Sequence, residues 1–449
     1  TRLARDGQGR VIRSYQPDGS QSEQHYDDAT GRLVQSTDAA GATTHYRYDD
    51  WGRLTEIQQA DGSHQRYQYP EPQDSPLTCD SPSAIEDPRG GTKSLGYTSA
   101  GQLQSYTDCS GHSSHYRYDR FGDLIEATNA LGERQRHERD AQGRITATQL
   151  ANGQVERYHY NSRGQLVRIE PTTASEASGN TAQPPSAIEL AYDLWGRLTQ
   201  RTHGGLGLGF SYDIAGRLTH ITNENAAQSH FAWDAMDRLV QEVGFDTRLQ
   251  RYAWDAAGQL TAASDGNARY QNTTQYQWDD AGRLKERTLP ATATTPAQTH
   301  RYQWDKAGRL EKASVYQHPR DLVTNLATQP DINPDTATYL QSQIELQRDT
   351  LGRLSTETQR LYRPGPNGQP EVEFEHSISH QFDALGNRQA SVLQGAGQID
   401  WQLYGSGHVH GLLHNGASLV DIERDGLHRE TQRSLHGPNP NPNPSSALQ

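Results

Sequence analysis

The stretch Tyr48-Asp49-Asp50-Trp51-Gly52-Arg53-Leu54 decides the fold, because the chain repeats it many times. The pattern is an aromatic residue, Asp, two variable residues, Gly, Arg and Leu, and it returns at 192–198 and 212–218. Trp replaces Tyr in the copies at 278–284 and 304–310. Self-similarity at a fixed spacing is the sequence signature of a repeat architecture, so the repeat is the unit in which the chain has to be interpreted.

Weaker copies extend the array over most of the chain. They occupy residues 97–103, 118–124, 160–166, 233–239 and 254–260. The copy at 26–33 carries one extra residue, and the copy around Asp349 has lost its aromatic residue. Most successive Asp positions, or the positions that replace Asp, are 20 or 21 residues apart. We therefore predict one continuous array of about fifteen periods.

Each period contains a second turn signal. Asp61-Gly62 and Asn152-Gly153 are its short forms, and dipeptides of this kind are the strongest short-range signal for a β-hairpin. One period is therefore predicted to form a turn, a strand, a second turn and a second strand. In Tyr46-x-Tyr48 two aromatic residues share one face of the second strand, because side chains alternate along a strand.

The residues of the repeat have predicted physical roles. The Asp carboxylate is suited to accept a hydrogen bond from the backbone amide two residues further on, which starts the turn. Gly supplies the positive φ angle that the turn requires. Leu is expected to enter the next strand on its buried face, and Arg is expected to lie across neighbouring aromatic rings.

The composition favours a large sheet over a solid globular core. Leu, Ile, Val and Phe make up only about 16% of the chain, yet 22 Tyr and 7 Trp are present and the net charge of −13 is modest. Two strands per period give about thirty strands, and an antiparallel sheet of that size is expected to twist and curl. We predict an all-β fold, in which a large antiparallel sheet of hairpins curls into a spiral, hollow, barrel-like cocoon.

The array is predicted to cover residues 1–435, and a low-complexity tail rich in Pro and Asn to cover 436–449. Inserts interrupt the regular spacing near 70–88, 171–188, 288–298, 316–342 and 363–371. Inserts rich in Pro and small residues are typical of surface loops. Residues 337–347 are the one segment for which we consider a helix.

Composition also excludes several classes of function. The acidic balance, with a pI of about 5.8, gives no electrostatic basis for binding nucleic acid. No apolar run approaches the roughly 20 residues that a membrane span needs.

The chain opens inside a repeat without Met or a signal-peptide pattern, so we interpret it as part of a longer polypeptide. Two cysteines, Cys79 and Cys109, allow either one disulfide or two reduced thiols.

The most suggestive group of potential metal ligands is His408-x-His410, because alternate residues of a strand share a face. His414 follows this pair, and Asp400 and Asp421 flank it. The simpler interpretation is a Gly-rich turn with incidental histidines, which we favour because no Cys or carboxylate completes a convincing ligand set. We assign no metal-binding residue.

The many Asp residues raise the question of a glycosidase, which needs a pair of carboxylates. They recur at the turn of every period, however, whereas a catalytic pair is not repeated a dozen times. The Gly-rich stretch at 204–210 lacks the strand-then-helix context and the Lys-Ser/Thr ending of a nucleotide loop, and it is predicted to be a hairpin. We assign no catalytic residue, no cofactor and no cofactor-binding residue, and we expect that the chain is not an enzyme.

The array resembles the YD-repeat core of bacterial RHS proteins, and more distantly the C proteins of insecticidal toxin complexes and the animal teneurins. The resemblance covers nearly the whole chain. Four segments outside the simple repeat are also similar to segments of bacterial RHS cores. They are Asp87-Pro88-Arg89-Gly90-Gly91, Thr107-Asp108-Cys109-Ser110-Gly111, Tyr404-Gly405-Ser406-Gly407-His408 and Glu423-Arg424-Asp425-Gly426-Leu427-His428-Arg429-Glu430.

The resemblance implies a ribbon of strands that spirals into a cocoon around a toxic C-terminal domain until delivery. Many relatives are type VI secretion effectors or other polymorphic toxins used against competing bacteria. The implied partners are a toxin domain of the same polypeptide and secretion spike or chaperone proteins, and the implied location is secreted or cell-surface. Asp87-Pro88 lies too early to be the self-cleavage motif of the family, so neither toxicity nor autoproteolysis is assigned to this chain.

The alternative is an adhesion array that binds glycans or cell-surface partners, because repeated Tyr and Trp can stack on sugar rings. Aromatic stripes at strand spacing are more often the packing layer of the sheet itself, which favours the shell. Glycan binding that disappears when exposed Trp residues are replaced would favour adhesion.

Overall fold

A computed structural model describes the chain in seven segments. They are residues 1–71, 77–172, 186–267, 271–292, 294–318, 338–365 and 369–437. These residues form 36 β-strands and no helix, so the all-β prediction is confirmed. Nothing in the described segments is a helix long and apolar enough to span a membrane. The chain divides into two compact units, the first made of Thr1–Ser113 with Tyr276–Gln449 and the second of Ser114–Gln275.

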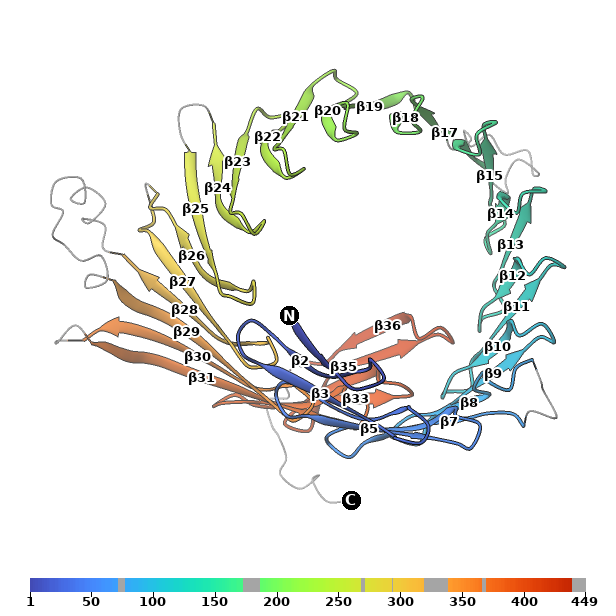
Figure 1. The fold of residues 1–449 in the computed structure, drawn as a ribbon, viewed down its shortest axis with the longest axis horizontal. Coiled ribbons are helices and arrows are strands. Elements are labelled where there is room, and N and C mark those ends of the chain that lie inside the picture. Colours follow the sequence, from blue (N-terminus) through green and yellow to red (C-terminus); the bar gives the residue numbers. More distant parts are fainter. Residues whose placement is uncertain are drawn as a thin grey trace. The chain divides into compact units, whose positions relative to one another are not determined.

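The first unit combines strands from both ends of the chain (Figure 1). Its N-terminal strands are β1 (Arg2–Arg5), β2 (Val11–Tyr15), β3 (Gln21–Tyr26), β4 (Leu33–Thr37), β5 (Thr43–Tyr48), β6 (Leu54–Gln58), β7 (His64–Gln68), β8 (Ala84–Glu86), β9 (Thr92–Tyr97) and β10 (Leu103–Thr107). Its C-terminal strands are β26 (Leu284–Leu289), β27 (Gln298–Trp304), β28 (Leu310–Gln317), β29 (Tyr339–Arg348), β30 (Leu354–Pro364), β31 (Pro370–Phe382), β32 (Arg388–Leu393), β33 (Gly397–Tyr404), β34 (His408–His414), β35 (Ala417–Arg424) and β36 (Glu430–Leu435).

The second unit contains the strands from the middle of the chain, and its first and last strands run slightly beyond its bounds. They are β11 (Ser113–Tyr118), β12 (Leu124–Thr128), β13 (Arg134–Arg139), β14 (Ile145–Gln149), β15 (Val155–Tyr160), β16 (Leu166–Thr172), β17 (Ile188–Tyr192), β18 (Leu198–His203), β19 (Leu206–Tyr212), β20 (Leu218–Thr222), β21 (Gln228–Trp233), β22 (Leu239–Val243), β23 (Leu249–Trp254), β24 (Leu260–Gly266) and β25 (Gln271–Trp278).

Within each unit the strands pair antiparallel with their neighbours in the sequence. In the hairpin β5–β6, Tyr46 pairs with Ile57, and the register then shifts so that Tyr48 lies opposite Leu54. The same shift recurs where the aromatic residue of other repeats meets the following Leu. A β-bulge at a fixed position bends each hairpin in the same way and increases its twist.

The turn of each repeat is built as predicted, with one addition. In the turn after β17, the Oδ1 atom of Asp193 accepts hydrogen bonds from the amides of Trp195 (2.9 Å) and Arg197 (3.0 Å). Gly196 has a φ of 87°. The addition is that Oδ2 of Asp193 accepts a third hydrogen bond, from Nε of Arg197 at 2.6 Å. Both carboxylate oxygens therefore accept hydrogen bonds from within their own turn.

Aromatic residues connect each repeat to the preceding one. The hydroxyl of Tyr212 donates a hydrogen bond to the carbonyl oxygen of Leu198, in the hairpin before it, at 2.8 Å. The guanidinium of Arg197 lies over the Tyr212 ring, 4.9 Å from its centroid, as the sequence predicts. Where Trp replaces Tyr, as at Trp233, its Nε1 atom donates to the corresponding carbonyl oxygen of Leu218 at 2.7 Å.

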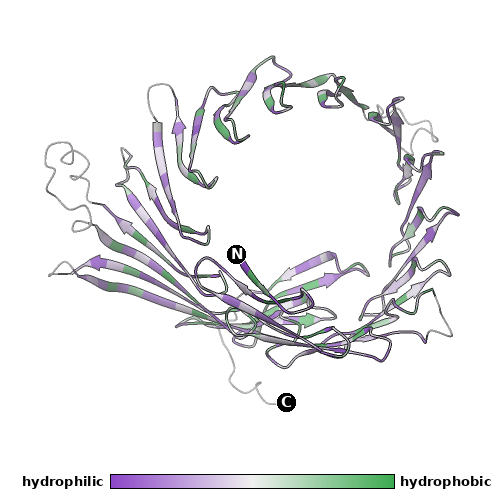
Figure 2. Cartoon of the chain, in the orientation of Figure 1, coloured by the Kyte–Doolittle hydropathy of each residue, from purple (hydrophilic) through white to green (hydrophobic). Residues whose placement is uncertain are grey.

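Very little of the sheet is fully buried. Among the described residues, the only hydrophobic side chains in the buried class are Ala147 and Ala390, each 3% exposed, and no large side chain is fully buried. The Leu residues of the repeat, such as Leu54, are half-buried. Figure 2 shows hydrophilic and hydrophobic residues interspersed along the strands. The sheet is therefore a thin wall stabilised by lateral pairing and partial burial, without a solid core.

The considered helix at 337–347 is wrong over the described residues, because Tyr339–Arg348 form strand β29. Its sequence alternates in the manner of a strand, and it pairs on both sides, with Ile344 between Ala313 of β28 and Gln359 of β30. Hydrogen bonding to two neighbours outweighs the local preference for a helix.

The predicted inserts and tail fall partly outside the described residues. The chain is not described at 72–76, 173–185, 268–270, 293, 319–337, 366–368 and 438–449. Strands lie on both sides of each internal gap, and the last described strand, β36, ends at Leu435. The domain limits at 435 and 436 stay a prediction.

In the first unit, turns from the N-terminal hairpins contact turns from the C-terminal hairpins through ion pairs. These pairs are Asp18–Arg283 (3.0 Å), Asp61–Arg353 (3.4 Å) and Arg89–Asp383 (3.3 Å). The last two join residues 292 and 294 positions apart in the sequence. The turns that carry the candidate site belong to the same series of contacts.

Candidate functional site

Three turns of the first unit meet at one place. They are the turn between β10 and β11 with Asp108 and His112, the turn between β33 and β34 after Tyr404, and the turn between β35 and β36 with His428. Each turn comes from one of the segments that resemble bacterial RHS cores. The structure thus brings together segments that are far apart in the sequence.

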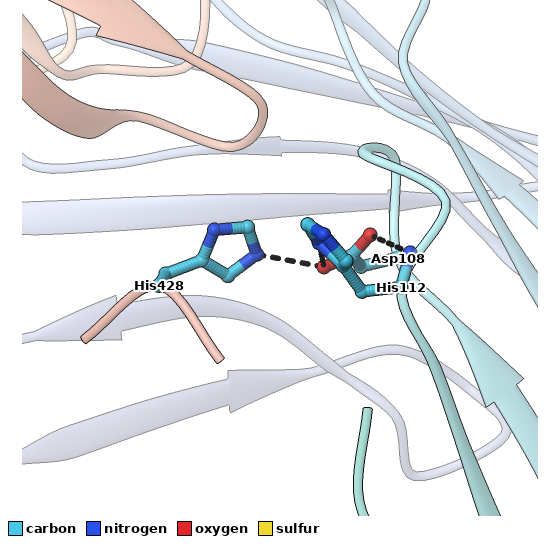
Figure 3. Close-up of side chains that lie close together, drawn as sticks. All are labelled: Asp108, His112 and His428. Atoms are coloured by element: carbon cyan, nitrogen blue, oxygen red, sulfur yellow. Dashed lines mark hydrogen bonds and ion pairs between the residues drawn. The ribbon is translucent and has the colours of Figure 1, made fainter. Parts of the chain in front are cut away.

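Asp108 lies between two imidazoles (Figure 3). Its Oδ2 atom is 2.7 Å from Nε2 of His428 and 3.5 Å from Nδ1 of His112. The Nδ1 atom of His428 is 2.9 Å from the Tyr404 hydroxyl. The side chains of His428 and Asp108 are only 12% and 15% exposed, so these contacts are screened from solvent more than surface ion pairs are.

Ring contacts surround the same group. The His408 ring stacks on the His428 ring with centroids 3.7 Å apart and an angle of 9° between the planes. The His112 ring meets His428 edge-on, with centroids 5.0 Å apart. Tyr404 touches His408 and His428 with centroids 5.5 Å away in both cases. The orientation of His428 is therefore fixed on several sides.

The surroundings set the charge of the cluster. Burial opposes ionisation of Asp108, but the hydrogen bond from His428 and those from two backbone amides outweigh it and lower the pKa of the carboxyl. Burial lowers the pKa of His408, and the neighbouring His428 and Arg424 lower it further. Burial raises the pKa of the Tyr404 phenol. At neutral pH, Asp108 is therefore ionised, His408 is neutral and Tyr404 keeps its proton.

The turns that hold the cluster have the hydrogen bonds of ordinary repeat turns. The amide of Asp108 donates to the carbonyl of His112 at 3.0 Å, and the amide of Asp425 donates to that of Arg429 at 3.0 Å. The amide of His428 donates back to the carbonyl of Asp425 at 2.9 Å. The repeat itself thus positions the side chains of Asp108, His112 and His428.

The remaining residues of these segments pack closely around the cluster. The Sγ atom of Cys109 is 3.0 Å from Oγ of Ser406. A Cβ atom at Gly91 would lie 3.1 Å from Cβ of Cys109, so the segment at 87–91 also reaches this place. In the described part of the chain Cys79 and Cys109 form no disulfide, which answers the question that the sequence left open.

The metal pair considered from the sequence does not form a larger ligand group. His408 lies in the cluster, whereas His410 is exposed and His414 is hydrogen-bonded to the carbonyl of Ala396 at 2.8 Å. Asp421 is bonded to His436 at 2.6 Å.

A different group has the geometry of a ligand set. Among the described residues, one group of three His, Cys, Asp or Glu side chains has all its ligand atoms within 4.8 Å of one another, and it consists of Asp108, His112 and His428. Sequence reasoning missed it because 320 positions separate Asp108 from His428. A signal was present, since His428 stands where a turn of the repeat normally has Gly.

Two other sequence features have structural roles. The Gly-rich stretch at 204–210 contains the turn of the hairpin β18–β19, with Gly204 and Gly205 at φ angles of 60° and 82°, as predicted. The repeated Asp carboxylates are used by their turns, as at Asp49, Asp213 and Asp305, where Arg four residues further on is bonded to Oδ2.

Comparison with known proteins identifies the repeat. The family model described as RHS Repeat matches residues 28–64, 97–134, 139–181 and 254–294. The chain is 30% identical over 363 residues to Double-stranded DNA deaminase toxin A of Burkholderia cenocepacia (strain H111). It is 37% identical over 111 residues to Toxin protein Tse5 of Pseudomonas aeruginosa.

These relatives are much longer than the chain. The first alignment covers 79% of the chain and 22% of the deaminase toxin, and the second covers 25% of the chain and 8% of Tse5. Among solved structures, the crystal structure of TcdB2-TccC3-TEV is similar over 98% of the chain and 29% of the solved one, with 13% identity and a TM-score of 0.47. The repeat, its hairpins and the matched family model show that the chain contains RHS repeats.

Proposed function

We propose that the chain is the wall of an RHS shell, which encloses a toxin domain attached at its C-terminal side and helps to deliver it to competing bacteria. In this proposal the sheet curls into a hollow cocoon. The toxin belongs to the same longer polypeptide, and secretion spike or chaperone proteins act as further partners. A type VI secretion system is the proposed route out of the producing cell.

The observation that carries the proposal is the thinness of the sheet. Among the described residues only Ala147 and Ala390 are buried hydrophobic residues, so the strands do not fold onto one another around a solid core. A wall of half-buried residues can grow repeat by repeat without filling its interior. Both named relatives are toxins, and this supports a link between the wall and a toxin.

We further propose that the chain itself catalyses no reaction. The carboxylates of the repeat are bonded to backbone amides and to Arg within their own turns, as at Asp193, which leaves them no free oxygen for acid–base work. The deaminase relative is about five times longer than the region it shares with this chain, which leaves ample room for a separate domain with that activity.

The first test is the intact mass and terminal sequence of the native polypeptide from its source cell. We expect a chain that continues past Gln449 into a further domain. That domain should resist protease in the native polypeptide, and the same domain expressed alone should be cut at the same protease concentration. A native chain that ends at Gln449, or a domain cut equally fast in both forms, would contradict encapsulation.

A second candidate function, glycan binding, has support from a few exposed aromatic residues. The repeat aromatics themselves are used in packing and hydrogen bonding, but Trp51, Phe121 and Trp195 lie at turns and are 64%, 75% and 79% exposed. Aromatic faces of this kind can stack on sugar rings. A glycan array would show binding that is lost in Trp51→Ala and Trp195→Ala, whereas no signal with the unmodified chain would rule this function out.

A further inference from the structure

The repeat provides a reference for what a turn normally contains. In an ordinary turn, Oδ2 of the Asp is bonded to Nε of the Arg four residues further on, as in Asp49–Arg53 at 2.7 Å. The residue before that Arg is usually Gly with a positive φ. Several turns of the array depart from this pattern, and two of those that do so contact each other. His112 stands in the Arg position after Asp108, and His428 stands in the Gly position after Asp425.

The backbone conformation of His428 is unusual for a residue with a side chain. Its φ is 60°, in the left-handed region that favours Gly, although His is found there more often than most residues. Ala226 and Asp237 occupy the same turn position with φ angles of 59° and 60°, so the conformation alone does not indicate a site. What distinguishes His428 is that its ring reaches a carboxylate 320 positions away.

The three side chains have the geometry of a ligand set. Asp108, His112 and His428 each offer one ligand atom, and these three atoms all lie within 4.8 Å of one another. The distances from Oδ2 to the two nitrogens are 2.7 and 3.5 Å. Two donor atoms bound to one tetrahedral Zn²⁺ ion lie roughly 3.3 Å apart, given metal–ligand distances of about 2.0 Å. Small side-chain movements therefore suffice to place all three atoms around one ion.

Two further observations point to a missing ligand. The Tyr404 hydroxyl lies 2.9 Å from Nδ1 of His428. If a metal ion replaces the Nε2 proton that His428 donates to Asp108, Nδ1 can carry the ring proton and donate it to this oxygen, the arrangement that metal-binding histidines usually have. In addition, Nδ1 of His112 is buried, and apart from the 3.5 Å ion pair with Asp108 it has no hydrogen-bond partner among the described residues. Buried polar atoms without a partner are uncommon and costly, and a metal ion would satisfy this one.

The simpler interpretation is that His428 replaces the Arg residues that join turns elsewhere in this unit. At Arg283 and Arg353 a single cation pairs with an Asp of the facing turn. That interpretation accounts for the contact between His428 and Asp108. It does not account for a second imidazole, that of His112, 3.5 Å from the same carboxylate oxygen, whose buried Nδ1 atom forms no hydrogen bond.

We propose that Asp108, His112 and His428 bind one divalent transition-metal ion, with Zn²⁺ as the first choice. Two imidazoles and one carboxylate favour Zn²⁺ and its neighbours over Ca²⁺ and Mg²⁺, which prefer sets made of oxygen atoms. Three protein ligands leave a fourth position for water. The bound ion cross-links the turn at 108–112 to the turn at 425–428 and so fastens the C-terminal hairpins of the first unit to its N-terminal hairpins.

The repeat itself suggests the most informative variants. His112→Arg restores the ordinary Arg partner of a turn Asp, and His428→Gly restores the ordinary Gly, so both variants remove a ligand while returning the turn to a sequence that the array tolerates. Asp108→Asn removes the carboxylate charge and keeps an oxygen for the backbone amides. His115→Ala and His410→Ala are matched controls, because both histidines are exposed and lie close in sequence to the proposed ligands or to their neighbours.

The experiment is a titration of the metal-free 449-residue chain with Zn²⁺ by calorimetry, followed by thermal melting with and without the ion. We expect one ion per chain, a higher melting temperature with Zn²⁺, and no comparable effect of Mg²⁺ or Ca²⁺. Asp108→Asn, His112→Arg and His428→Gly should each weaken binding by at least tenfold, and the two controls should bind like the unmodified chain. Tyr404→Phe should weaken binding by about tenfold through the loss of its contact with His428.

Several results would overturn the proposal. One is an unmodified chain that binds no Zn²⁺. Another is binding of equal affinity in the three ligand variants, which would show that other side chains hold the ion. A loss of binding in His410→Ala as large as in His112→Arg would place the metal at the 408–410 pair instead. Circular dichroism of every variant without metal establishes that a loss of binding does not come from a loss of fold.

Discussion

In most repeats the structure requires a hydrogen-bond donor at the aromatic position, with or without a ring. Tyr212 and Trp254 each donate to the carbonyl of a Leu in the preceding hairpin, at 2.8 and 2.9 Å. Arg139 and Arg348 occupy the same position, and their Nη2 atoms donate to the corresponding carbonyls at 3.3 and 3.2 Å. The copy around Asp349 has therefore lost its ring but not its hydrogen bond. The sequence does not reveal this requirement. Tyr, Trp and Arg all have a long side chain with a hydrogen-bond donor, but they belong to different residue classes.

Tyr212→Phe should test this requirement, because it removes only the hydroxyl. The carbonyl of Leu198 then loses its side-chain donor, and we expect the free energy of unfolding to fall by about 0.5–1.5 kcal/mol. Tyr212→Trp keeps a hydrogen-bond donor and should lower the free energy of unfolding by less. Hydrogen exchange of β18 to β20 measures the local effect, and equal protection in Tyr212→Phe and the unmodified chain would show that the hydroxyl is dispensable.

Gly52 and Gly62 test the requirement for a positive φ. Both have left-handed φ angles, of 86° and 84°. A β-branched residue at either position should lower the free energy of unfolding by roughly 1–3 kcal/mol through backbone strain alone. Nothing lies within 4 Å of a Cβ at Gly62, whereas a Cβ at Gly52 would overlap the guanidinium of Arg32. We expect Gly52→Val to be at least as destabilising as Gly62→Val in urea unfolding. Unchanged unfolding and proteolysis in both variants would show that these turns are assigned wrongly.

At the scale of the hairpin, most of the structure could be predicted from the sequence. Strand, turn and Asp–Gly spacing are local properties, so the strands on either side of Asp49 or Asp193 follow directly from the repeat. The helix considered at 337–347 was wrong because strand β29 is fixed by neighbours on both sides, and no local pattern reports on such neighbours. The Asp–Arg contact inside each turn was also not foreseen, since Arg was expected only to cover aromatic rings.

The charged turns should make the sheet sensitive to acid. Burial opposes ionisation of Asp193, but hydrogen bonds from the Arg197 amide and guanidinium outweigh it, so the pKa lies below the usual value of about 3.8. The same direction applies in other turns of the array. These are the turns of Asp6, Asp49, Asp140, Asp213, Asp234, Asp279, Asp305 and Asp425.

A pKa that is lower in the folded state means that folding favours the ionised carboxyl. The stabilisation is fully present above the unfolded pKa of about 3.9 and is lost as the pH falls through the folded value. The urea midpoint should therefore be nearly constant above pH 5 and should fall steeply below about pH 4. Asp193→Asn keeps the amide-accepting oxygen, as Asn161 does naturally, and should reduce this acid sensitivity. A midpoint independent of pH between 5 and 2 would contradict the role of the turn carboxylates.

At the scale of the whole molecule, the sequence could suggest the repeat array but not which distant turns meet. The contacts of Asp18 with Arg283 and of Asp108 with His428 depend on how the hairpins of the first unit lie against one another, and no spacing rule encodes that. The candidate site is therefore the part that sequence reasoning missed, even though all of its segments had been singled out by resemblance. His112 and His428 differ from the ordinary turn residues, and both lie against the carboxylate of Asp108.

The proposed enclosure of a toxin domain is tested most directly by imaging. Single-particle electron microscopy of the native polypeptide should show a hollow shell whose wall is one sheet thick, with density for a further domain inside. Loss of that interior density in a polypeptide truncated at Gln449 would assign it to the toxin domain. A solid particle, or an extended rod with no internal cavity, would contradict the account.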